Sequence, residues 1–460
     1  MIVCFALIQQ FFLYQLILTV HITIPKILRR MSLIIYLIHP LVIVLIRAFA
    51  KIINNEYLVD NNLVFFVLVT ILSIFISYIF CKITEDKQPQ NLKSRAWAEI
   101  NLKNLQHNYQ EIKNILPNSC EFMAVVKANA YGHGSIKVAK TLQKLGCNSY
   151  AVASINEAIE LRKARIKGDI LILGYTSIND LYKLNKYNLI QTAVDYNYAK
   201  QLNSFNNNIR THLKLDTGMH RLGEDYKHIK TIENMLKLPN IIVEGIYTHL
   251  CVADSLSVYN IKYSEFQIEN FYQVLQKLKS LGLKIPKHHI QSSYGVVNYP
   301  ELKCDYARVG IFLYGSKSQV KDEVKIELNL KPLLSVKARI SAIKKIPAHQ
   351  PIGYGRKHIP IKDSTIATLT IGYADGIPRN LNNAYVLVKD QKAPIIGLIC
   401  MDQMTVDISN INNVNQGDIV TILGVDINKE ISALQLATSA NIITNELYSR
   451  LGERLNRIYV

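Results

Sequence analysis

The sequence lacks the cysteine spacing of a metal or disulfide site. Its seven cysteines are scattered along 460 residues, are odd in number, and nowhere form a CxxC motif. A disulfide framework or a metal site is therefore not expected, and a reducing compartment is favoured for the soluble part. Acidic residues are also few, 35 against 53 Lys and Arg, but the basic excess is spread along the chain without an Arg-rich arm. We therefore expect no nucleic-acid partner.

Charged residues are absent from the first 24 positions and again from residues 63 to 81. Each stretch is long and apolar enough to cross a bilayer. Residues 31 to 46 form a third apolar run, interrupted by His39 and Pro40, so we predict about three transmembrane helices within residues 1 to 90. A cleaved secretory signal fits less well, because the first run lacks a basic start and a small-residue cleavage site.

The basic residues around these runs predict their orientation. Lys and Arg gather at residues 26 to 30 and 82 to 95, whereas the loop around Glu56 and Asp60 is rich in Asn. Basic loops remain in the cytoplasm, which places the remaining four-fifths of the chain there as well. We expect a multi-pass protein of the cytoplasmic membrane, with a linker around Pro89.

One pattern recurs between residues 121 and 314: a short β-rich apolar run, a polar turn, and an amphipathic helical stretch. Spacings of about twenty to forty residues suit a strand, a helix and two loops, so we predict a (β/α)8 barrel over residues 91–330. A doubly wound open sheet is the alternative, but no GxGxxG follows the first run. The eight runs begin near Phe122, Tyr150, Ile170, Leu189, Thr211, Ile242, His288 and Tyr306.

The helical pattern fades after about Pro332. Residues 331–460 read as a mostly β C-terminal domain, because β-branched segments alternate with turn residues until a helical stretch near residues 431 to 438. The predicted strands are residues 334–340, 365–371, 385–388, 394–400 and 419–423.

Reactive side chains follow several of the predicted barrel strands. Lys127 ends the first, His249 the sixth, Ser293 the seventh, and Arg308 lies in the eighth. Taken singly, Lys127 could extend its amine out of the barrel mouth, His249 could be a core histidine, and Arg308 a surface cation. Barrel enzymes build their active sites at this end, so convergence of the four on one rim indicates a site.

Six motifs in order over about residues 95 to 460 resemble the alanine racemase family of pyridoxal phosphate enzymes, which have fold type III. They are VVKANAYGHG, LKLDTGMHRLG, GIYTHL, RVGIFLYG, IGYADG and ICMDQ. The resemblance implies a barrel followed by a β domain, and a homodimer with shared active sites. It also implies an isomerase that supplies D-alanine for bacterial peptidoglycan. Residues 36 to 40, YLIHP, are similar to the end of membrane acyltransferases, a module that membrane-bound serine racemases also carry.

The resemblance implies a role for each matching residue. Lys127 would bind pyridoxal 5'-phosphate covalently and serve as one proton carrier, and Tyr373 would be the second, linked through His249 to Arg308. Tyr131, Ser293 and the Gly310 backbone would bind the cofactor phosphate, and Arg308 would face its ring nitrogen. Arg221 and Met401 would bind the substrate, with Lys214, often carbamylated in the family, supporting Arg221. Because Tyr373 and Met401 lie in the β domain, they would reach the partner's barrel.

Racemisation explains why two proton carriers are needed: one removes the α-proton from one face and the other returns a proton to the opposite face. Three positions depart from the family pattern: Leu398, where the family usually has arginine, Ser292 for asparagine, and Asn445 for a phosphate-binding tyrosine. Serine stays open beside alanine as substrate because of the membrane module that serine racemases also carry. A related barrel decarboxylase, disfavoured by Arg308, and an inactive membrane-anchored scaffold are the remaining alternatives.

Overall fold

The computed structural model describes residues 26–55, 57–83, 94–205, 207–381 and 383–460. The chain divides into two compact units, Met1–Leu92 and Lys93–Val460. The predicted apolar run at residues 1 to 24 and the linker around Pro89 lie outside the described residues.

The first unit contains two long helices that pack against each other. Helix α2 (Lys26–Ile52) covers the predicted run at residues 31 to 46, and α4 (Asn62–Ile83) covers the run at 63 to 81, with the short α3 (Tyr57–Asp60) between them. Val42 and Ile46 pack against Phe65 and Val69. Within the described residues one helical segment, Asn62–Ile79, is long and apolar enough to cross a membrane, by length and composition. Two of the predicted runs fall within the described residues, and the structure identifies one of these two as a candidate span.

The second unit begins with a parallel barrel of eight strands in the order β10-β2-β3-β4-β5-β6-β8-β9. All eight predicted runs form strands, and Asp305 N donates to His288 O at 2.9 Å where β9 and β10 adjoin. The strands are β2 (Glu121–Val125), β3 (Ser149–Val152), β4 (Asp169–Ile172), β5 (Ile190–Ala193), β6 (Ile209–Asp216), β8 (Ile241–Tyr247), β9 (Lys287–His289) and β10 (Tyr306–Val309); the two-residue β7 (Glu224–Asp225) pairs with β6.

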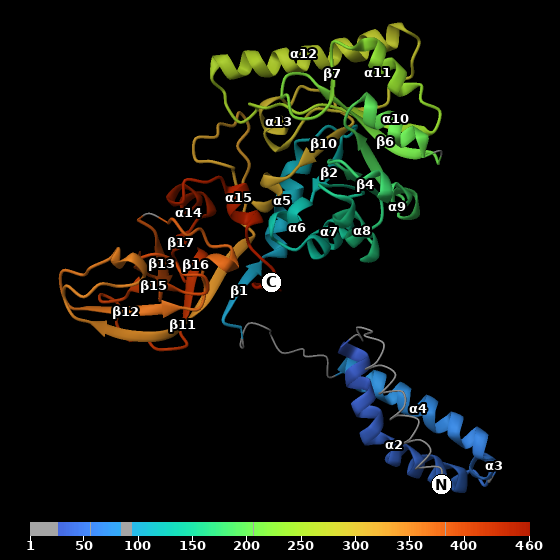
Figure 1. Ribbon diagram of the computed structural model, residues 1–460, viewed down its shortest axis with the longest axis vertical. Coiled ribbons are helices and arrows are strands. Elements are labelled where there is room, and N and C mark those ends of the chain that lie inside the picture. Colours follow the sequence, from blue (N-terminus) through green and yellow to red (C-terminus); the bar gives the residue numbers. More distant parts are fainter. Residues whose placement is uncertain (1–25, 56, 84–93, 206, 382) are drawn as a thin grey trace. The chain divides into compact units, whose positions relative to one another are not determined.

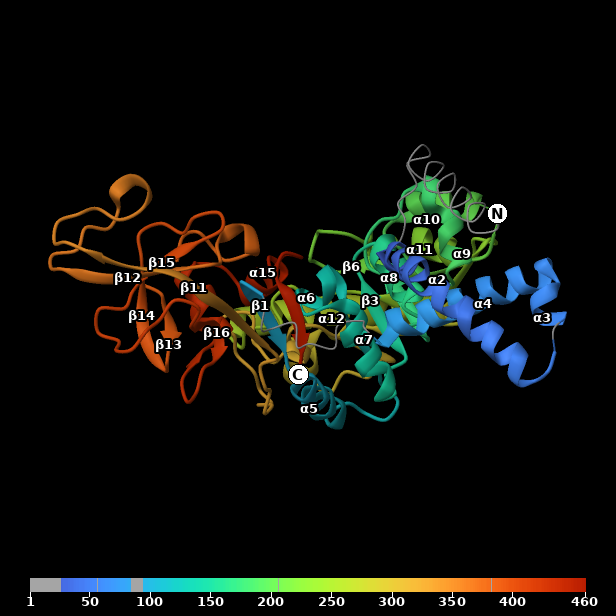
Figure 2. The same cartoon turned by 90° about the horizontal axis from the view of Figure 1, so that it is seen from below.

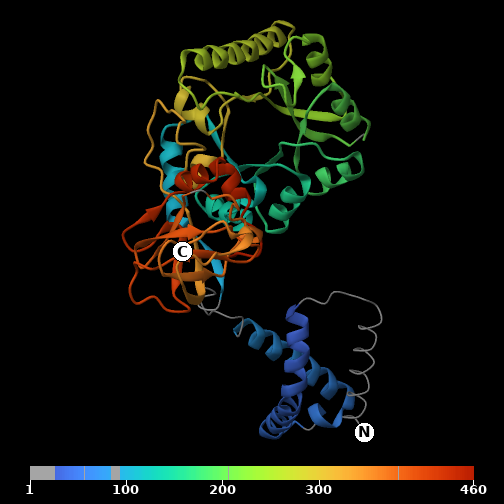
Figure 3. The same ribbon diagram turned by 60° about the vertical axis from the view of Figure 1, so that its left-hand side comes forward.

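Helices surround this ring of strands (Figures 1 and 3). Alternate strand residues face opposite sides, so Phe122 and Ala124 pack in the main core, while Met123 and Val125 join a separate cluster that fills the ring. The helices are α5 (Leu102–Asn114), α6 (Lys127–Tyr131), α7 (Ser135–Lys144), α8 (Ile155–Lys163), η2 (Ile178–Asp180), α9 (Leu181–Lys186), α10 (Tyr196–Ser204), α11 (Ile229–Leu236), α12 (Val258–Ser280), α13 (Ser293–Asn298) and η3 (Ile311–Tyr314).

The C-terminal domain is mostly β, as predicted. Pairing of β16 with β11 closes β11, β12, β15, β14, β13 and β16 into a ring. Its elements are β11 (Leu334–Ile346), η4 (Tyr354–Arg356), β12 (Ser364–Leu369), η5 (Tyr373–Asp375), β13 (Tyr385–Val388), β14 (Gln391–Ile396), β15 (Met404–Asp407), β16 (Ile419–Val425), β17 (Glu430–Ile431), α14 (Ala433–Ser439), α15 (Thr444–Ser449) and β18 (Asn456–Tyr459).

The structure moves several predicted boundaries. The strand predicted at 394–400 is β14, which starts at Gln391 because a tight turn with positive φ at Lys389 and Asp390 joins it directly to β13. It ends before Gly397, whose φ is +68°. The predicted helical stretch is α14, which begins after Ser432, whose side chain accepts from the Gln435 amide.

Four strands of this domain were not predicted: β15, β17, β18 and β1 (Ala96–Ile100). Although β1 lies in the range assigned to the barrel, it pairs antiparallel with β11 and parallel with β18. Figure 2 shows it beside β11. Its partners are distant in sequence, so the local pattern gave no sign of the pairing.

Candidate active site

A cavity of about 450 Å³ lies at the carboxyl ends of the barrel strands, where barrel enzymes place their sites. Eight of the ten predicted site residues line it: Lys127, Tyr131, Lys214, Arg221, His249, Ser293, Arg308 and Gly310. Tyr373 and Met401 are absent from its lining. The structure therefore brings together every predicted residue of the barrel but neither predicted residue of the β domain.

Lys127 stands at the start of an unusual left-handed turn. The φ angles of the next four residues, 128 to 131, lie between 51° and 54°, although none of them is glycine. Left-handed backbone costs an L-residue roughly 1–2 kcal/mol, so surrounding contacts must hold this turn in place. Burial is the main cause that lowers the pKa of Lys127, with Arg221 adding to it, which favours an uncharged amine able to act as a nucleophile.

Hydrogen bonds hold the turn from both ends. The Ala128 amide donates to Glu157 Oε1 at 2.7 Å, and the Ser135 amide donates to the side chain of Asn129 at 2.8 Å. The turn ends at Gly132, whose φ is +77° and where an added Cβ would lie 2.2 Å from the Tyr448 carbonyl oxygen. A glycine is thus required at this position both for its backbone angle and for its contact with the β domain.

Tyr131, Ser293 and Gly310 form one end of the cavity. The Gly310 amide donates to Ser293 Oγ at 3.0 Å, and an added Cβ at Gly310 would lie 2.7 Å from the Tyr131 hydroxyl. Burial raises the pKa of Tyr131 to about 12, so its hydroxyl keeps its proton and can donate. A hydroxyl, a serine and a glycine backbone that leaves room for close approach suit a phosphate group.

Arg308 is buried beneath this cavity and is held by neutral acceptors. Its Nη2 donates to the carbonyls of Thr248 at 2.7 Å and Ile290 at 3.0 Å, and contacts Nδ1 of His249 at 3.4 Å. Burial lowers its pKa to about 10, so the guanidinium stays charged at neutral pH. Burial lowers the pKa of His249 well below its usual value, with Arg308 reinforcing the shift, so His249 is neutral.

Lys214 and Arg221 supply further nitrogen atoms to the cavity. Burial, helped by Arg308, lowers the pKa of Lys214 well below its usual value, and its Nζ donates to the Leu215 carbonyl at 2.9 Å. Arg221 is exposed and follows a loop that Asp216 fixes, whose Oδ1 accepts from the amides of Gly218, Met219 and His220 at 3.0 Å each. The cavity therefore presents an excess of cationic and donor groups and fits a ligand with a phosphate and a carboxylate.

Tyr373 and Met401 lie together on the β domain. The Tyr373 amide donates to the Cys400 carbonyl and the Ala374 amide to the Met401 carbonyl, both at 3.0 Å. Their side chains are exposed, 39% for Tyr373 and 54% for Met401. Both are thus presented at the surface of this chain, outside its own cavity.

Three residues at the site escaped the sequence reasoning. The ring of Tyr247 contacts both Lys214 and Arg308: its centroid lies 5.1 Å from Lys214 Nζ and 5.0 Å from Arg308 Cζ. Glu157 contacts the lysine-bearing turn, and the Ser154-x-x-Glu157 capping-box pattern was the available signal. Asp375 supports the Tyr373 turn and is the aspartate of the IGYADG motif.

Of the three departures from the family pattern, Ser292 and Asn445 line the cavity, whereas Leu398 does not. Asn445 Oδ1 is buried without a hydrogen-bond partner among the described residues. An amide side chain thus lines the cavity where the resembled family has a tyrosine.

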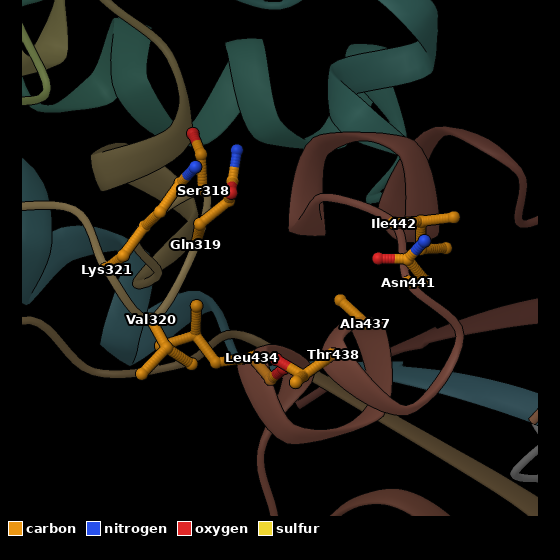
Figure 4. A pocket seen from close by; sticks show the side chains of 9 residues that line it. All are labelled: Ser318, Gln319, Val320, Lys321, Leu434, Ala437, Thr438, Asn441 and Ile442. Carbon is orange, nitrogen blue, oxygen red and sulfur yellow. The ribbon is translucent and has the colours of Figure 1, made fainter. Parts of the chain in front are cut away.

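A second hollow of about 210 Å³ borders the first through Ser318, which lines both. Figure 4 shows that its side chains come from two segments, residues 318–321 and 434–442. Lys321 is the one charged residue in its lining, so it lacks the convergent groups of the larger cavity.

Comparisons with protein families and known proteins agree with this architecture. The model of the alanine racemase N-terminal domain matches residues 100–318, and that of the C-terminal domain matches residues 333–459. An alanine racemase of Carboxydothermus hydrogenoformans is 39% identical over 370 residues, which cover 79% of this chain and 99% of that protein. An alanine racemase structure from Clostridium difficile has a TM-score of 0.75 and 34% identity, covering 80% of this chain and 96% of the other.

Longer relatives also match. An amino-acid racemase of Enterococcus faecalis is 43% identical over 411 residues, 88% of this chain but 58% of the relative. A serine/alanine racemase of Enterococcus gallinarum is 36% identical over 437 residues, 93% of this chain and 60% of the relative. These matches are longer than residues 93–460, so they include part of the first unit. The chain spans about 60% of these relatives' length.

Proposed function

This chain belongs to the alanine racemase family, and on that premise we propose that it interconverts L- and D-alanine with pyridoxal 5'-phosphate as cofactor. The observation that carries the proposal is one cavity that joins Lys127, the Tyr131–Ser293–Gly310 end, and the buried Arg308. A lysine amine, a phosphate site and a hydrogen-bond partner for the ring nitrogen are what this cofactor requires, and Arg308 is such a partner.

Each of these residues has a separate role. Lys127 binds the cofactor covalently, because its amine is uncharged more readily than an exposed lysine. Tyr131, Ser293 and the Gly310 backbone bind the phosphate, and Arg308 faces the ring nitrogen. When bound, the cofactor supplies an electron-withdrawing ring that stabilises negative charge at the substrate α-carbon. Because Arg308 keeps its proton, it would donate a hydrogen bond to the ring nitrogen of the bound cofactor.

Proton transfer requires one group on each face of the substrate. The Lys127 amine removes or returns the α-proton on one face, and the Tyr373 hydroxyl acts on the other. Because Tyr373 and Met401 are exposed away from this chain's cavity, we propose that they complete the cavity of a second copy. The protein then works as a homodimer with shared active sites.

Arg221 orients the substrate carboxylate by its charge, and Met401 of the second copy approaches it through its backbone. Lys214 supports Arg221. Burial lowers the pKa of Lys214 and so favours its uncharged amine, the form that reacts with carbon dioxide to give a carbamate. A carbamate would add a negative charge between Arg221 and Arg308 and offset their repulsion.

Serine is the second candidate substrate. Asn445 lines the cavity where the resembled family has a tyrosine, so its amide side chain is a candidate partner for a substrate hydroxyl, which alanine lacks. The serine/alanine racemase that matches along 93% of this chain supports the same alternative.

We also propose that the first unit anchors the enzyme in the bacterial cytoplasmic membrane, with the catalytic unit in the cytoplasm. Large apolar side chains of α2 and α4 are exposed, such as Leu41 at 60%, Leu63 at 73% and Phe75 at 57%. Exposed apolar surface on all sides of a helix pair suits lipid better than water. Fractionation of cells should recover the full chain with membranes, and recovery in the soluble fraction would contradict the anchor.

The deciding experiment incubates the purified full chain and pyridoxal phosphate with α-deuterated alanine and serine in parallel. Loss of deuterium together with inversion of configuration supports the proposal, and the two rates rank the substrates. Intact deuterium in both would overturn it. Faster turnover of serine that Asn445→Ala abolishes would favour the serine alternative.

A further inference from the structure

Glu157 collects three backbone amides that belong to two different segments. Its Oε1 accepts from Ala128 at 2.7 Å, and its Oε2 accepts from Ala153 at 2.7 Å and from Ser154 at 3.3 Å. Ala153 and Ser154 lead into α8, whereas Ala128 follows the cofactor-binding lysine. One carboxylate thus ties the start of α8 to the left-handed turn.

The turn needs such a contact more than ordinary backbone does. Its four residues with positive φ have side chains beyond glycine, and the turn joins Lys127 at one end to Tyr131 at the other. These two side chains reach the cavity from a single strained segment. A shift of the turn would therefore move the amine and the phosphate-binding hydroxyl together.

A carboxylate is the group that the position requires. Three amide donors converge on two oxygens, and both oxygens are used. A glutamine side chain would offer one oxygen and point an NH2 group at an amide donor. The negative charge also raises the pKa of Lys127, against the lowering by burial and by Arg221.

We propose that Glu157 is a positioning residue for cofactor attachment: it locks the turn through the Ala128 amide and sets the charge balance at Lys127. This inference rests on the proposed function. It assigns Glu157 no contact with substrate or cofactor.

The test titrates pyridoxal phosphate into apo-protein of the full chain and follows the absorbance of the lysine-bound cofactor. For Glu157→Gln we expect about tenfold weaker binding, the effect of losing one hydrogen bond to a charged group. We also expect the pH midpoint of the attachment rate to move to lower pH, because the negative charge that raises the pKa of Lys127 is gone. An unchanged affinity and an unchanged midpoint would overturn the proposal.

Two further variants distinguish the effect of the Glu157–Ala128 hydrogen bond from the effects of the α8 helix cap and of the Glu157 charge. Ser154→Ala removes the other half of the same capping box, where Ser154 Oγ accepts from the Glu157 amide at 3.4 Å, and should leave both readouts unchanged. An equal loss in Ser154→Ala would show that the helix cap, and not the turn, matters. Glu157→Asp keeps the charge but shortens the reach to Ala128, so it should weaken binding while the pH midpoint stays in place.

Two controls keep the outcomes distinct. Circular dichroism checks that each apo-variant is folded. If Glu157→Gln does not fold, the cofactor titration of Glu157→Asp tests the proposal instead. If the unsubstituted chain itself forms no lysine-bound cofactor, the proposed function fails. If the unsubstituted chain does form the lysine-bound cofactor, and the Glu157 variants bind the cofactor equally well, only the proposed role of Glu157 fails.

Discussion

Arg308 donates from Nη1 to Nδ1 of His289 over 2.5 Å, and every acceptor that the described residues offer its guanidinium is neutral. An arginine can only donate, so Nδ1 of His289 accepts and its single proton sits on Nε2. Nε2 in turn lies 2.9 Å from Nδ1 of His212. The two histidines thus form a neutral chain beneath Arg308 that leaves its positive charge available to the cavity.

This chain predicts that stability falls in mild acid. Burial lowers the pKa of His212 to about 3 and that of His289 well below its usual value. A histidine of the unfolded chain gains its proton below about pH 6.5, whereas these two stay neutral in the folded state, so unfolding takes up protons as the pH drops. The free energy of unfolding should decrease from about pH 6.5 downward, by up to about 1.4 kcal/mol per pH unit for each histidine.

Denaturant unfolding of the full chain between pH 8 and pH 5 measures this slope. His212→Gln should reduce the slope of unfolding free energy against pH by the contribution of one proton. A slope that His212→Gln leaves unchanged would contradict the neutral chain.

Lys127→Ala should abolish cofactor attachment and racemisation together, because Lys214, the other lysine that lines the cavity, lies in β6 and donates to the Leu215 carbonyl at 2.9 Å. Lys140, exposed on α7, provides a matched control whose change to alanine should alter neither. Borohydride reduction of the unsubstituted protein and mass spectrometry of its peptides should locate the cofactor on Lys127. A cofactor mass on another lysine would remove Lys127 from the mechanism.

Shared active sites can be detected by mixing two inactive variants. Tyr373→Phe should slow conversion from one enantiomer more than from the other, because the hydroxyl serves one face. In a mixture with Lys127→Ala, each heterodimer regains one site with both groups, so refolding the two together should restore about a quarter of the original activity. No recovery, with heterodimers present by size and mass analysis, would show that Tyr373 serves its own chain.

Asp375 should be important for the position of Tyr373. Its fully buried carboxylate pairs with Arg95 at 2.5 Å and accepts from the Gly372 amide at 3.0 Å. Asp375→Asn should lower the free energy of unfolding by about 1–3 kcal/mol, a limited loss because Arg95 is partly exposed and solvent screens its charge. It should also reduce kcat, because the turn that carries Tyr373 loses its support. Asp402→Asn, at an exposed carboxylate paired with Arg454, is the control and should change stability little.

Removal of residues 1–90 should give a soluble and active dimer. Residues 93–460 form a compact unit, and relatives such as the Carboxydothermus enzyme align along 99% of their own length with 79% of this chain. Size-exclusion chromatography and the deuterium assay check the outcome. Aggregation without detergent would indicate that the first unit supports the fold of the catalytic unit.

Much of the fold and site could be predicted because the relevant signals are local. Most barrel strands are short buried runs that the local sequence pattern reveals, and all eight strands were located. Lys127, His249, Ser293 and Arg308 follow or occupy such strands, and the barrel geometry then requires them to share a rim. The order of six motifs supplied the roles.

The parts that could not be predicted depend on contacts between distant segments. Strand β1 acquires its place from β11 and β18, more than two hundred residues away. The sequence by itself determined the barrel, the β domain and the set of reactive residues, because periodicity and strand ends are written in neighbouring positions. Only the tertiary structure decided that Glu157 binds the amide of a left-handed turn and that Arg308 donates to neutral histidines. These are matters of burial and hydrogen-bond partners, which arise only when distant segments meet.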